Sequence, residues 1–443
     1  MTYTTARGRS TNAEANKLYI EDCAVHEWYR FVLSFPPHLV QSYLTQFQAG
    51  PGSLVLDPFC GTGTTLVECK KSGIPSIGVE ANPMAAFASE VKTDWMADAD
   101  GLMSHALMVA DAATARLAAD GIEDTTLLTP DEDPPLRGLT PELVKLLLTD
   151  SISPRPLHKT LVLLDCLAAY ADARYDAYER LALAKAVVHT SSNLHFGPEV
   201  GVGPLKLDAP VLAPWLAVVR SMSQDLVAVA PLRETPATIR RGDARQIVPL
   251  LEPASVDAVI TSPPYPNEKD YTRTTRLESV LLGMIRSKED LRMHKKGLVR
   301  SNTRTVYMGD DDDRWIADDT EIQRLAATIE ARRIELGKTS GFERLYAKVT
   351  KLYFGGMARH LAELRTRLQP GAQLAYVVGD QASYFRVMIR TGTLLARIAE
   401  RLGYEVVRID LFRTRLATAT KEQLREEVVV LRWPGPPPGR LLL

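Results

Sequence analysis

The chain has 443 residues, of which 45% are hydrophobic and 24% are charged, and its formal net charge at pH 7 is −1. This length suits one large domain with insertions or two to three smaller domains, and the composition is ordinary for a globular protein. Because the chain is nearly neutral, a nucleic-acid surface would have to be a local patch of cations balanced by acidic residues elsewhere.

Other residue patterns exclude several classes of protein. The four cysteines form no CxxC pair, which argues against a zinc site and against a disulfide framework. The first residues lack the apolar core of a signal peptide, and no stretch is long and apolar enough to span a membrane. We therefore expect a cytoplasmic protein with no bound metal and no membrane partner.

The N-terminal part of the chain predicts the start of a parallel sheet. Residues 1–20 are polar, and we expect them to be flexible. The run "HEWYRFVLSFPPHLVQSYLTQF" has apolar residues at helical spacing on either side of Phe-Pro-Pro. "PGSLVLDPFCGTGTTLVECKKSG" predicts a turn, a buried strand, a glycine-rich loop and a helix, and "IPSIGVEANPMAAFAS" predicts a second strand and helix.

A mostly helical insertion is predicted for residues 96–235. Residues 99–120 are alanine-rich with a helical period, residues 140–192 suit two or three helices, and "LAPWLAVVRSMSQDLVAVA" suits another. "PDEDPPLRGLTPE" predicts a linker, and "NLHFGPEVGVGPLKLDAP" predicts a loop rich in glycine and proline.

Strand signals resume after the insertion with "ATIRRGDA" and "VDAVITSPPY". Residues 267–340 form a basic and charged insertion, and a helix is predicted for about 342–368. "AQLAYVVGD", "EVVRIDLFRT" and "EEVVVLRWP" predict three further strands, with the helix "TGTLLARIAERLGY" among them. Two strands before the helical insertion and about five after it predict an α/β fold built from residues 21–95 and 236–433. The tail, 434–443, is expected to be extended.

The glycine-rich loop suggests the kind of ligand. In "VLDPFCGTGTT" the strand ends at Asp57, and Gly61 and Gly63 let the backbone pass close to a ligand where a Cβ would collide. The spacing lacks the wider glycine pattern of dinucleotide binders and the Lys-Ser/Thr of a P-loop, so a ligand without phosphates fits better. We expect a sulfonium cofactor such as S-adenosylmethionine. Its amino-acid end would find hydroxyl partners in Thr62, Thr64 and Thr65.

Two acidic residues at strand ends extend this cofactor hypothesis. Glu80 closes the second predicted strand and is placed to accept hydrogen bonds from two ribose hydroxyls. Asp243, in "RRGDARQI", ends another predicted strand, where it would accept from an adenine amino group. Acidic residues commonly end strands, so the alternative is a tight strand-helix turn with a solvated Glu80.

The runs "VLDPFCGTGTT" and "TSPPY" together resemble the DNA amino-methyltransferases, which methylate exocyclic amines of cytosine or adenine. The resemblance covers about residues 25–90 and 237–278 and, less clearly, 342–433. It implies a Rossmann-like methyltransferase sheet that binds S-adenosylmethionine, and "SFPPHLVQSYLTQF" resembles the motif that packs on the methionine end of that cofactor. The cofactor-binding residues so indicated are Phe35, Asp57, Pro58, Phe59, Gly61, Thr62, Gly63, Thr64, Thr65, Glu80, Asn82, Asp243 and Ala244.

The chain departs from the family pattern in the place of its insertion. The helical insertion lies between the Glu80 and Asp243 strands, and "GDA" and "TSPPY" are too close together to hold a target-recognition domain. Residues 96–235 are therefore either a target-recognition module or a structural or partner-binding cap.

The resemblance identifies "SPPY" as the catalytic loop, made by Ser262, Pro263, Pro264 and Tyr265. An aromatic amine is a poor nucleophile, and acceptors on its two N–H groups favour the tetrahedral geometry needed for attack. The Ser262 oxygen and the Pro263 carbonyl are suited to this, since the two prolines fix the backbone. Tyr265 can stack on a target base that has left the duplex.

A basic run follows the catalytic loop and suits a phosphate backbone. The alternative is a solvated helix face, because four aspartates at 310–313 balance much of this charge. The candidate nucleic-acid contacts are Lys269, Arg273, Arg276, Lys295, Lys296, Arg300 and Arg304.

These patterns favour a site-specific methyltransferase acting on double-stranded DNA. In the family, a serine in the first position of the catalytic loop accompanies cytosine N4 methylation more often than adenine N6 methylation. A restriction-modification or phage-defence role, with a cognate endonuclease as a possible partner, would fit. The alternatives are an adenine-N6 DNA methyltransferase, an RNA amino-methyltransferase, and a nucleic-acid-binding protein without activity.

Overall fold

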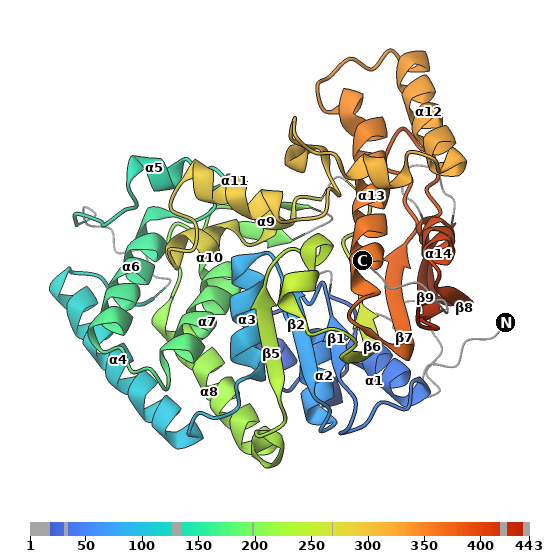
Figure 1. Ribbon diagram of the computed structural model, residues 1–443. Helices are drawn as coiled ribbons and strands as arrows, with labels where there is room; N and C mark the ends of the chain where they lie inside the picture. The colour runs from blue at the N-terminus through green and yellow to red at the C-terminus, as the bar shows by residue number, and fades with distance from the viewer. Residues whose placement is uncertain are drawn as a thin grey trace.

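A seven-stranded sheet runs through the centre of the molecule in the order β5-β2-β1-β6-β7-β9-β8 (Figure 1). β9 is antiparallel to both of its neighbours, and the other pairs are parallel. This arrangement confirms the predicted Rossmann-like α/β sheet, with two strands before the helical insertion and five after it. The strands are β1 (Val55–Asp57), β2 (Ser76–Glu80), β5 (Ala237–Arg241), β6 (Val256–Thr261), β7 (Leu368–Gly379), β8 (Glu405–Leu416) and β9 (Gln423–Arg432).

The computed structural model describes residues 18–30, 34–125, 134–196, 199–267, 269–416 and 423–436. Most of the predicted flexible start at 1–20 and of the predicted tail at 434–443 lies outside these ranges, as do the first residues of the predicted linker. Among the described residues, none of the helices combines the length and apolarity needed to cross a membrane.

Alternation along the strands divides the core of the sheet domain into two layers. Successive residues of a strand point to opposite faces, so Tyr376 of β7 packs in the layer of α13 and α14, while Val377 packs in the layer of α1 and α2. Both side chains are buried. The helices around the sheet are α1 (Pro37–Gln46), α2 (Thr64–Lys71), α3 (Pro83–Thr93), α13 (Tyr346–Leu364) and α14 (Thr391–Arg401).

Helices also dominate residues 96–235, which pack beside α3 on the left of Figure 1. They are α4 (Ala99–Ala119), α5 (Pro141–Val144), α6 (Pro154–Ala169), α7 (Asp176–Ala186) and α8 (Leu212–Val229). Their apolar side chains share one core with Val67 of α2 and Met84 of α3. The insertion is therefore packed continuously with the sheet domain.

The glycine- and proline-rich stretch of the insertion differs from the predicted loop. It contains two short strands, β3 (Leu194–Phe196) and β4 (Val200–Val202), which pair antiparallel. Strands this short carry too few residues for an alternating pattern to be recognised in the sequence.

The charged stretch after β6 folds into short helices above the sheet. They are α9 (Tyr271–Thr274), α10 (Arg276–Leu281), α11 (Lys288–Lys296) and α12 (Thr320–Glu335). In Figure 1, α11 lies over the insertion side, while α12 and the first turns of α13 project as a pair on the other side. The ends of the parallel strands lie below the gap between these two groups.

Candidate active site

A cavity of about 580 Å³ lies at the carboxyl ends of the parallel strands, where ligands bind in open α/β sheets. Segments that follow β1, β2, β5 and β6 meet at its walls, so the predicted cofactor loop and catalytic loop open into the same space. The predicted residues on its walls are Phe35, Pro58, Phe59, Gly61, Thr62, Thr64, Glu80, Asn82, Asp243, Ala244, Ser262, Pro263, Pro264, Tyr265 and Lys269.

The glycine loop is held in shape by the Glu80 carboxylate. Gly61 has a φ of 52°, which favours glycine, and a Cβ there would meet no atom within 4 Å. Its N–H donates to Glu80 Oε2 at 2.8 Å, and the N–H of Asn82 donates to Oε1 at 2.7 Å. Burial raises the pKa of Glu80 to about 7. Each carboxylate oxygen keeps acceptor capacity for a further donor.

Two buried polar groups lie at the loop, and one of them lacks the partner that such groups usually have. Thr62 lines the cavity, and its buried hydroxyl has no hydrogen-bond partner among the described residues. Behind it, the fully buried Lys92 donates to the Thr62 carbonyl at 2.8 Å and to the Tyr29 carbonyl at 3.3 Å. Burial lowers the pKa of Lys92 to about 7. Lys92 thus braces the loop from below.

The far end of the cavity is built from three separate elements. Asp243 accepts two hydrogen bonds from the guanidinium of Arg245, and the Ala244 carbonyl accepts one from the ring of His360 at 2.8 Å. His360 can donate there because its other ring nitrogen faces the Tyr376 hydroxyl at 2.7 Å. The turn after α11, residues 297–299, closes this end of the cavity.

Three predicted cofactor residues do not line the cavity. Asp57 is fully buried and accepts from the Thr261 hydroxyl at 2.6 Å, and burial raises its pKa to about 6. The Thr65 hydroxyl donates to the Ile260 carbonyl at 3.0 Å. Gly63 has a φ of 81°, and a Cβ there would lie 2.8 Å from the Ser89 hydroxyl. These residues support the loop and tie it to β6.

Asn82 lines the cavity, but its side chain is already engaged. Its oxygen accepts from the N–H groups of Met84 and Ala85, which caps α3. Its amide donates to the Thr275 hydroxyl at 3.2 Å. Asn82 therefore shapes the cavity and leaves little side-chain capacity for a ligand.

The polar groups of this half of the cavity fit S-adenosylmethionine. Glu80 would hold the ribose hydroxyls, and the unpartnered Thr62 hydroxyl would bind the amino-acid end beside Phe35. Asp243 and Ala244 lie where the adenine would be held. The open space over Gly61 allows a ligand to approach the backbone.

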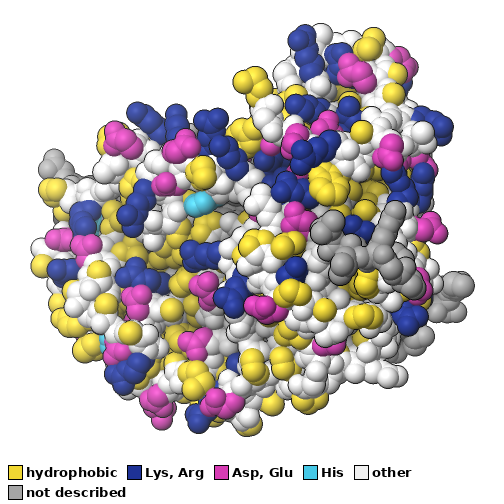
Figure 2. Space-filling view, in the orientation of Figure 1, with side chains coloured by type: hydrophobic (Ala, Val, Ile, Leu, Met, Phe, Trp, Pro, Cys, Tyr) yellow, Lys and Arg dark blue, Asp and Glu magenta, His cyan; other side chains and the backbone are white. Residues whose placement is uncertain are grey.

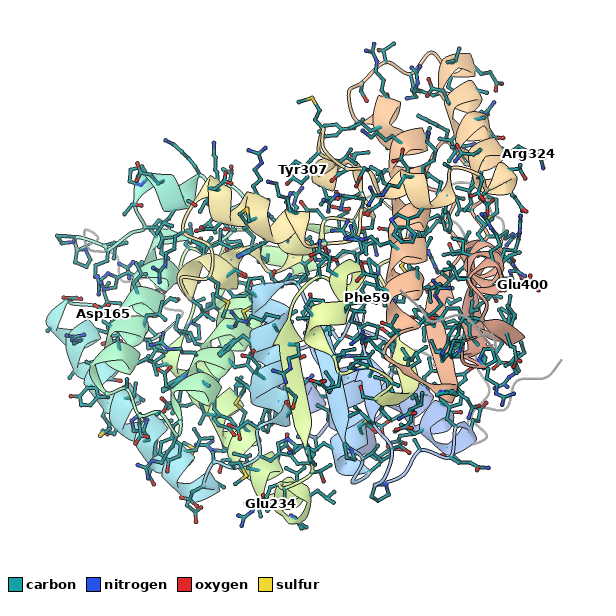
Figure 3. The ribbon with its side chains drawn as sticks, viewed as in Figure 1. Phe59, Asp165, Glu234, Tyr307, Arg324 and Glu400 are labelled. Carbon is teal, nitrogen blue, oxygen red and sulfur yellow. The ribbon has the colours of Figure 1, made fainter. Side chains whose placement is uncertain are left out.

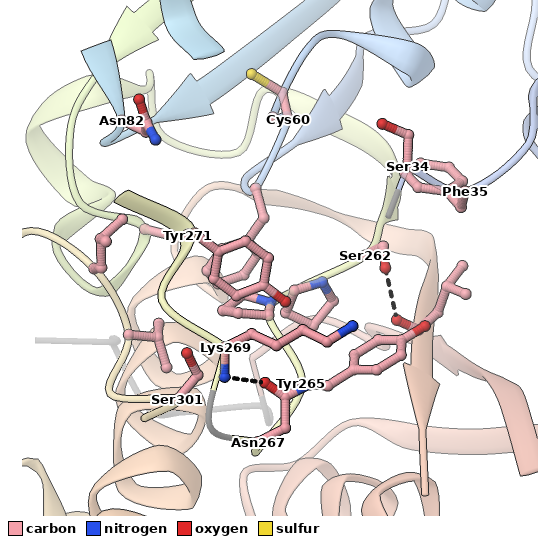
Figure 4. A pocket seen from close by; sticks show the side chains of 18 of the residues that line it. Ser34, Phe35, Cys60, Asn82, Ser262, Tyr265, Asn267, Lys269, Tyr271 and Ser301 are labelled. Carbon is pink, nitrogen blue, oxygen red and sulfur yellow. Dashed lines mark hydrogen bonds between the residues drawn. The ribbon is translucent and has the colours of Figure 1, made fainter. Parts of the chain in front are cut away.

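The catalytic loop faces the other half of the cavity (Figure 4). The Ser262 hydroxyl donates to the Val377 carbonyl on β7 at 3.2 Å. Because a hydroxyl has one proton, this bond leaves the Ser262 oxygen free to act as an acceptor. The next residue, Pro263, is buried. Its backbone has a carbonyl oxygen that can accept a hydrogen bond but no N–H that can donate one.

The ring of Tyr265 is seated on the end of β7. A Cβ on Gly379 would lie 2.7 Å from the Tyr265 ring, so glycine is needed there for close packing. Burial, and to a lesser degree the carboxylate of Glu426, raises the pKa of Tyr265 above its usual range. The phenol is therefore neutral, and its ring provides an aromatic wall for the cavity.

Comparison with known proteins agrees with this geometry. Residues 7–89 match the N6_N4_Mtase family, described as DNA methylase. The chain is 24% identical over 447 aligned residues to the Type II methyltransferase M.BsoBI of Geobacillus stearothermophilus, covering 92% of this chain and 84% of that protein. It is 22% identical to the Type II methyltransferase M.AvaI of Anabaena variabilis, covering 92% of this chain and 86% of that protein.

The chain thus carries a DNA methylase match at residues 7–89 and is similar over most of its length to Type II methyltransferases. A solved structure, the rRNA methyltransferase aviRa of Streptomyces viridochromogenes, has 10% identity and a TM-score of 0.34 over 97% of this chain and 96% of that chain. That score is too low to indicate more than a general likeness. The similarity to these methyltransferases agrees with the placing of both predicted loops on one cavity.

The predicted DNA-contacting cations differ in how exposed they are to solvent. Figure 2 shows Lys and Arg side chains gathered along the top of the molecule over α11 and in the notch beside α13. Lys296 and Arg304 are exposed, and Arg304 lies 3.9 Å from Glu199 of the insertion. Lys269 is partly buried on the cavity wall, and Arg273 is also partly buried.

Three predicted DNA contacts are used inside the protein instead. Arg300 is 3% exposed and forms two hydrogen bonds with Asp310, so its guanidinium is already occupied within the fold. Lys295 donates to Asp270 at 2.8 Å, and burial of both side chains keeps this pair from solvent. Arg276 donates to the carbonyls of Thr272 and of Leu146 in the insertion, which joins the two regions.

Sequence patterns missed the residues that support the site from a distance. Lys92, Val377, Gly379 and His360 lie on α3, β7 and α13, far along the chain from the loops they hold. A lysine within an apolar helical pattern was a possible signal for Lys92, because buried lysines are rare. No local pattern marks the backbone carbonyl of Val377 or the close approach at Gly379.

Proposed function

We propose that this methylase transfers a methyl group from S-adenosylmethionine to the exocyclic N4 amine of a cytosine flipped out of double-stranded DNA. The observation that carries the proposal is that Ser262, whose hydroxyl donates to the Val377 carbonyl, lines the same cavity as the cofactor residues. A serine there, with Pro-Pro-Tyr after it, favours cytosine over adenine by the resemblance to the family. Adenine N6 is the alternative target.

The residues of the catalytic loop would act on the amine in a defined way. The Ser262 oxygen and the Pro263 carbonyl accept its two N–H groups, so its lone pair turns away from the ring and toward the cofactor half of the cavity. Tyr265 stacks on the base and holds its plane. When bound, S-adenosylmethionine supplies the electrophilic methyl group. The amine proton passes to solvent after transfer.

The place of the cations supports DNA as the substrate. Lys288 and Lys296 are exposed on α11, and the turn that follows this helix lines the cavity. Phosphate contacts of this kind fix the register of a duplex and make binding depend on salt. The base must leave the helix to reach a cavity below this surface.

We also propose that residues 96–235 take part in target recognition. Glu199, next to β4, lines the cavity, and its carboxylate lies 3.9 Å from the guanidinium of Arg304. A part of the insertion therefore reaches the mouth of the site, where a cap elsewhere on the domain would not. The relatives are Type II methyltransferases, which favours a role in restriction-modification with a cognate endonuclease.

Incubation with isotope-labelled S-adenosylmethionine and unmethylated duplex DNA or RNA tests this proposal. Digestion of the product and mass spectrometry should identify N4-methylcytosine in DNA. N6-methyladenine would establish the alternative target, and label found only in RNA would overturn the proposal. No transfer to either polymer, with the cofactor bound, would instead favour an inactive nucleic-acid-binding protein.

A further inference from the structure

A methionine three residues after a residue of the cavity wall is almost fully exposed. Met308 has 99% of its surface accessible, at the tip of a turn formed by residues 307–310. Single exposed apolar side chains are common on protein surfaces. Met308 differs from these because buried contacts hold the turn that carries it.

The turn under Met308 is braced by a buried ion pair. The N–H of Tyr307 donates to Asp310 Oδ2 at 2.6 Å, and the N–H of Asp310 donates to the Tyr307 carbonyl at 3.1 Å. Arg300, 3% exposed, donates to both oxygens of Asp310 at 2.8 Å. Breaking such a pair would leave a buried charge without its partner, which is strongly unfavourable, so these contacts hold the turn in place although its tip meets solvent.

The ring of Tyr307 adds to this bracing. The guanidinium of Arg300 lies 5.5 Å from its centroid and that of Arg292, on α11, lies 5.8 Å away. Both distances suit a cation–π interaction. The base of the turn is therefore fixed to α11, while the Met308 side chain is left outside.

The turn lies close to the mouth of the cavity. Thr305 lines the cavity and is three residues before Met308, so the two Cα atoms are at most about 11 Å apart. Figure 3 shows Tyr307 in the gap between α11 and α13. A duplex entering the site would pass over this point.

Cations flank the turn from both sides. On one side are the exposed residues of α11. On the other, Arg344, Lys348 and Lys351 follow at intervals of four and three residues, so they share one face of the α13 helix and the turn before it. Further along that face, Gly355 packs against the backbone of Asp312, two residues after the turn. The stripe on α13 therefore faces the segment that carries Met308.

From this arrangement we infer that Met308 is a wedge that enters the DNA stack where the target nucleotide leaves it. The inference rests on the proposed action on duplex DNA. Apolar side chains inserted between base steps stabilise unstacked DNA, and unstacking costs a few kcal/mol per step. The flexible, polarisable thioether adapts to the faces of neighbouring bases. Met308 is a positioning residue, since it acts on the reaction through the base.

Matched variants on two duplexes test the wedge. The target site is first mapped by sequencing methylated plasmid DNA, and oligonucleotide duplexes are made with the target nucleotide correctly paired or mispaired. A mispaired base is easier to extrude. The variants are Met308→Ala, Met308→Leu and, as a control, Met96→Ala, whose side chain is 57% exposed near the start of α4. Single-turnover methyl transfer and cofactor affinity are measured for each.

We expect Met308→Ala to lose about tenfold or more in rate on the paired duplex, with the loss largely recovered on the mispaired one. Met308→Leu should keep most of the rate, Met96→Ala all of it, and cofactor affinity should not change. An unchanged rate for Met308→Ala, or an equal loss on both duplexes, would overturn the wedge while leaving the proposed activity intact. A wild-type protein that methylates no DNA would overturn both.

Discussion

The two halves of the cavity use their polar groups differently. At the cofactor half, Glu80 and Asp57 hold the loop through hydrogen bonds to the backbone and to β6. At the DNA-facing half the cations are of two kinds. Arg300 is paired with Asp310 inside the fold, whereas Lys296 is exposed to solvent. The cofactor half is held in place before the ligand binds. Substitutions there should therefore reduce cofactor binding at any ionic strength. The DNA-facing half is adaptable, and each exposed cation should contribute little and in a salt-dependent way.

The largest loss is expected where the two halves meet, at Ser262. Ser262→Ala removes an acceptor from the amine, and kcat should fall about 100-fold or more, as for the loss of one stabilising group in other active sites. Cofactor affinity, measured by calorimetry, should not change. Ser383→Ala, an exposed serine on the same cavity, is the matched control and should stay close to wild type. Equal losses in both variants would contradict the role given to Ser262.

Glu80→Gln tests the cofactor half by cofactor binding. Hydrogen bonds to a charged acceptor contribute about 1.5–3 kcal/mol, so affinity should fall by roughly 10- to 100-fold. The pKa of Glu80 is raised to about 7, and the ionised form is the better acceptor for ribose. Wild-type affinity should therefore weaken as pH drops through 7, and that part of the pH dependence should be absent in Glu80→Gln. A pH profile unchanged by the substitution would assign the titration to another group.

The same raised pKa predicts the opposite trend for the stability of the cofactor-free protein. The folded state holds the Glu80 proton more tightly than the unfolded state, in which the pKa is near 4.5. The contribution of this group to the free energy of unfolding should be greatest below pH 4.5 and should be lost as pH rises to 7. Denaturant unfolding of wild type and Glu80→Gln across this window measures the difference.

Thr261→Val tests the hydrogen bond that links the end of β6 to Asp57, below the two loops. Valine keeps the shape but removes the hydroxyl that donates to the buried Asp57 at 2.6 Å. Leaving that carboxylate short of a donor should lower the free energy of unfolding by about 1–3 kcal/mol. Thr328→Val, on the exposed side of α12, should change it by less than about 0.5 kcal/mol. Urea unfolding monitored by circular dichroism gives both values.

The smallest effect per residue is expected on α11. Replacing the exposed Lys288 and Lys296 by glutamine should weaken DNA binding modestly. It should also reduce the slope of log affinity against log salt by about 0.9 for each phosphate that is no longer neutralised. Lys295→Gln changes the same charge on the same helix, but its partner is Asp270, so it should leave the slope unchanged. A slope reduced equally by Lys295→Gln would show that pairing in the fold does not decide which cations meet DNA.

The parts of the site that could be predicted from sequence are those where one residue type is needed locally. The left-handed backbone at residue 61 requires glycine, and acidic residues such as Glu80 end buried strands. The cofactor loop and the succession of strands along the chain could therefore be predicted from the sequence. The prolines of the catalytic loop gave a similar signal. These features depend on a few neighbouring residues and on the periodicity of the strands.

The rest depends on contacts between distant segments. The four aspartates at 310–313 indicate that the basic run is partly balanced, but the sequence does not say which cations pair, such as Arg300 with Asp310 and Lys295 with Asp270. The seat of Tyr265 at Gly379 joins positions more than a hundred residues apart. A charge count along the sequence gives the number of cations, but it does not give the number left after folding.

The seat at Gly379 has a consequence for motion in the site. Because the ring of Tyr265 packs directly on the backbone at the end of β7, it has no room to retreat on that side. The ring can move toward the cavity but not toward the sheet. A base that enters the site can therefore contact the ring but cannot push it toward β7. The sheet thus limits, from one side, how far the base can lie from the acceptors of the catalytic loop.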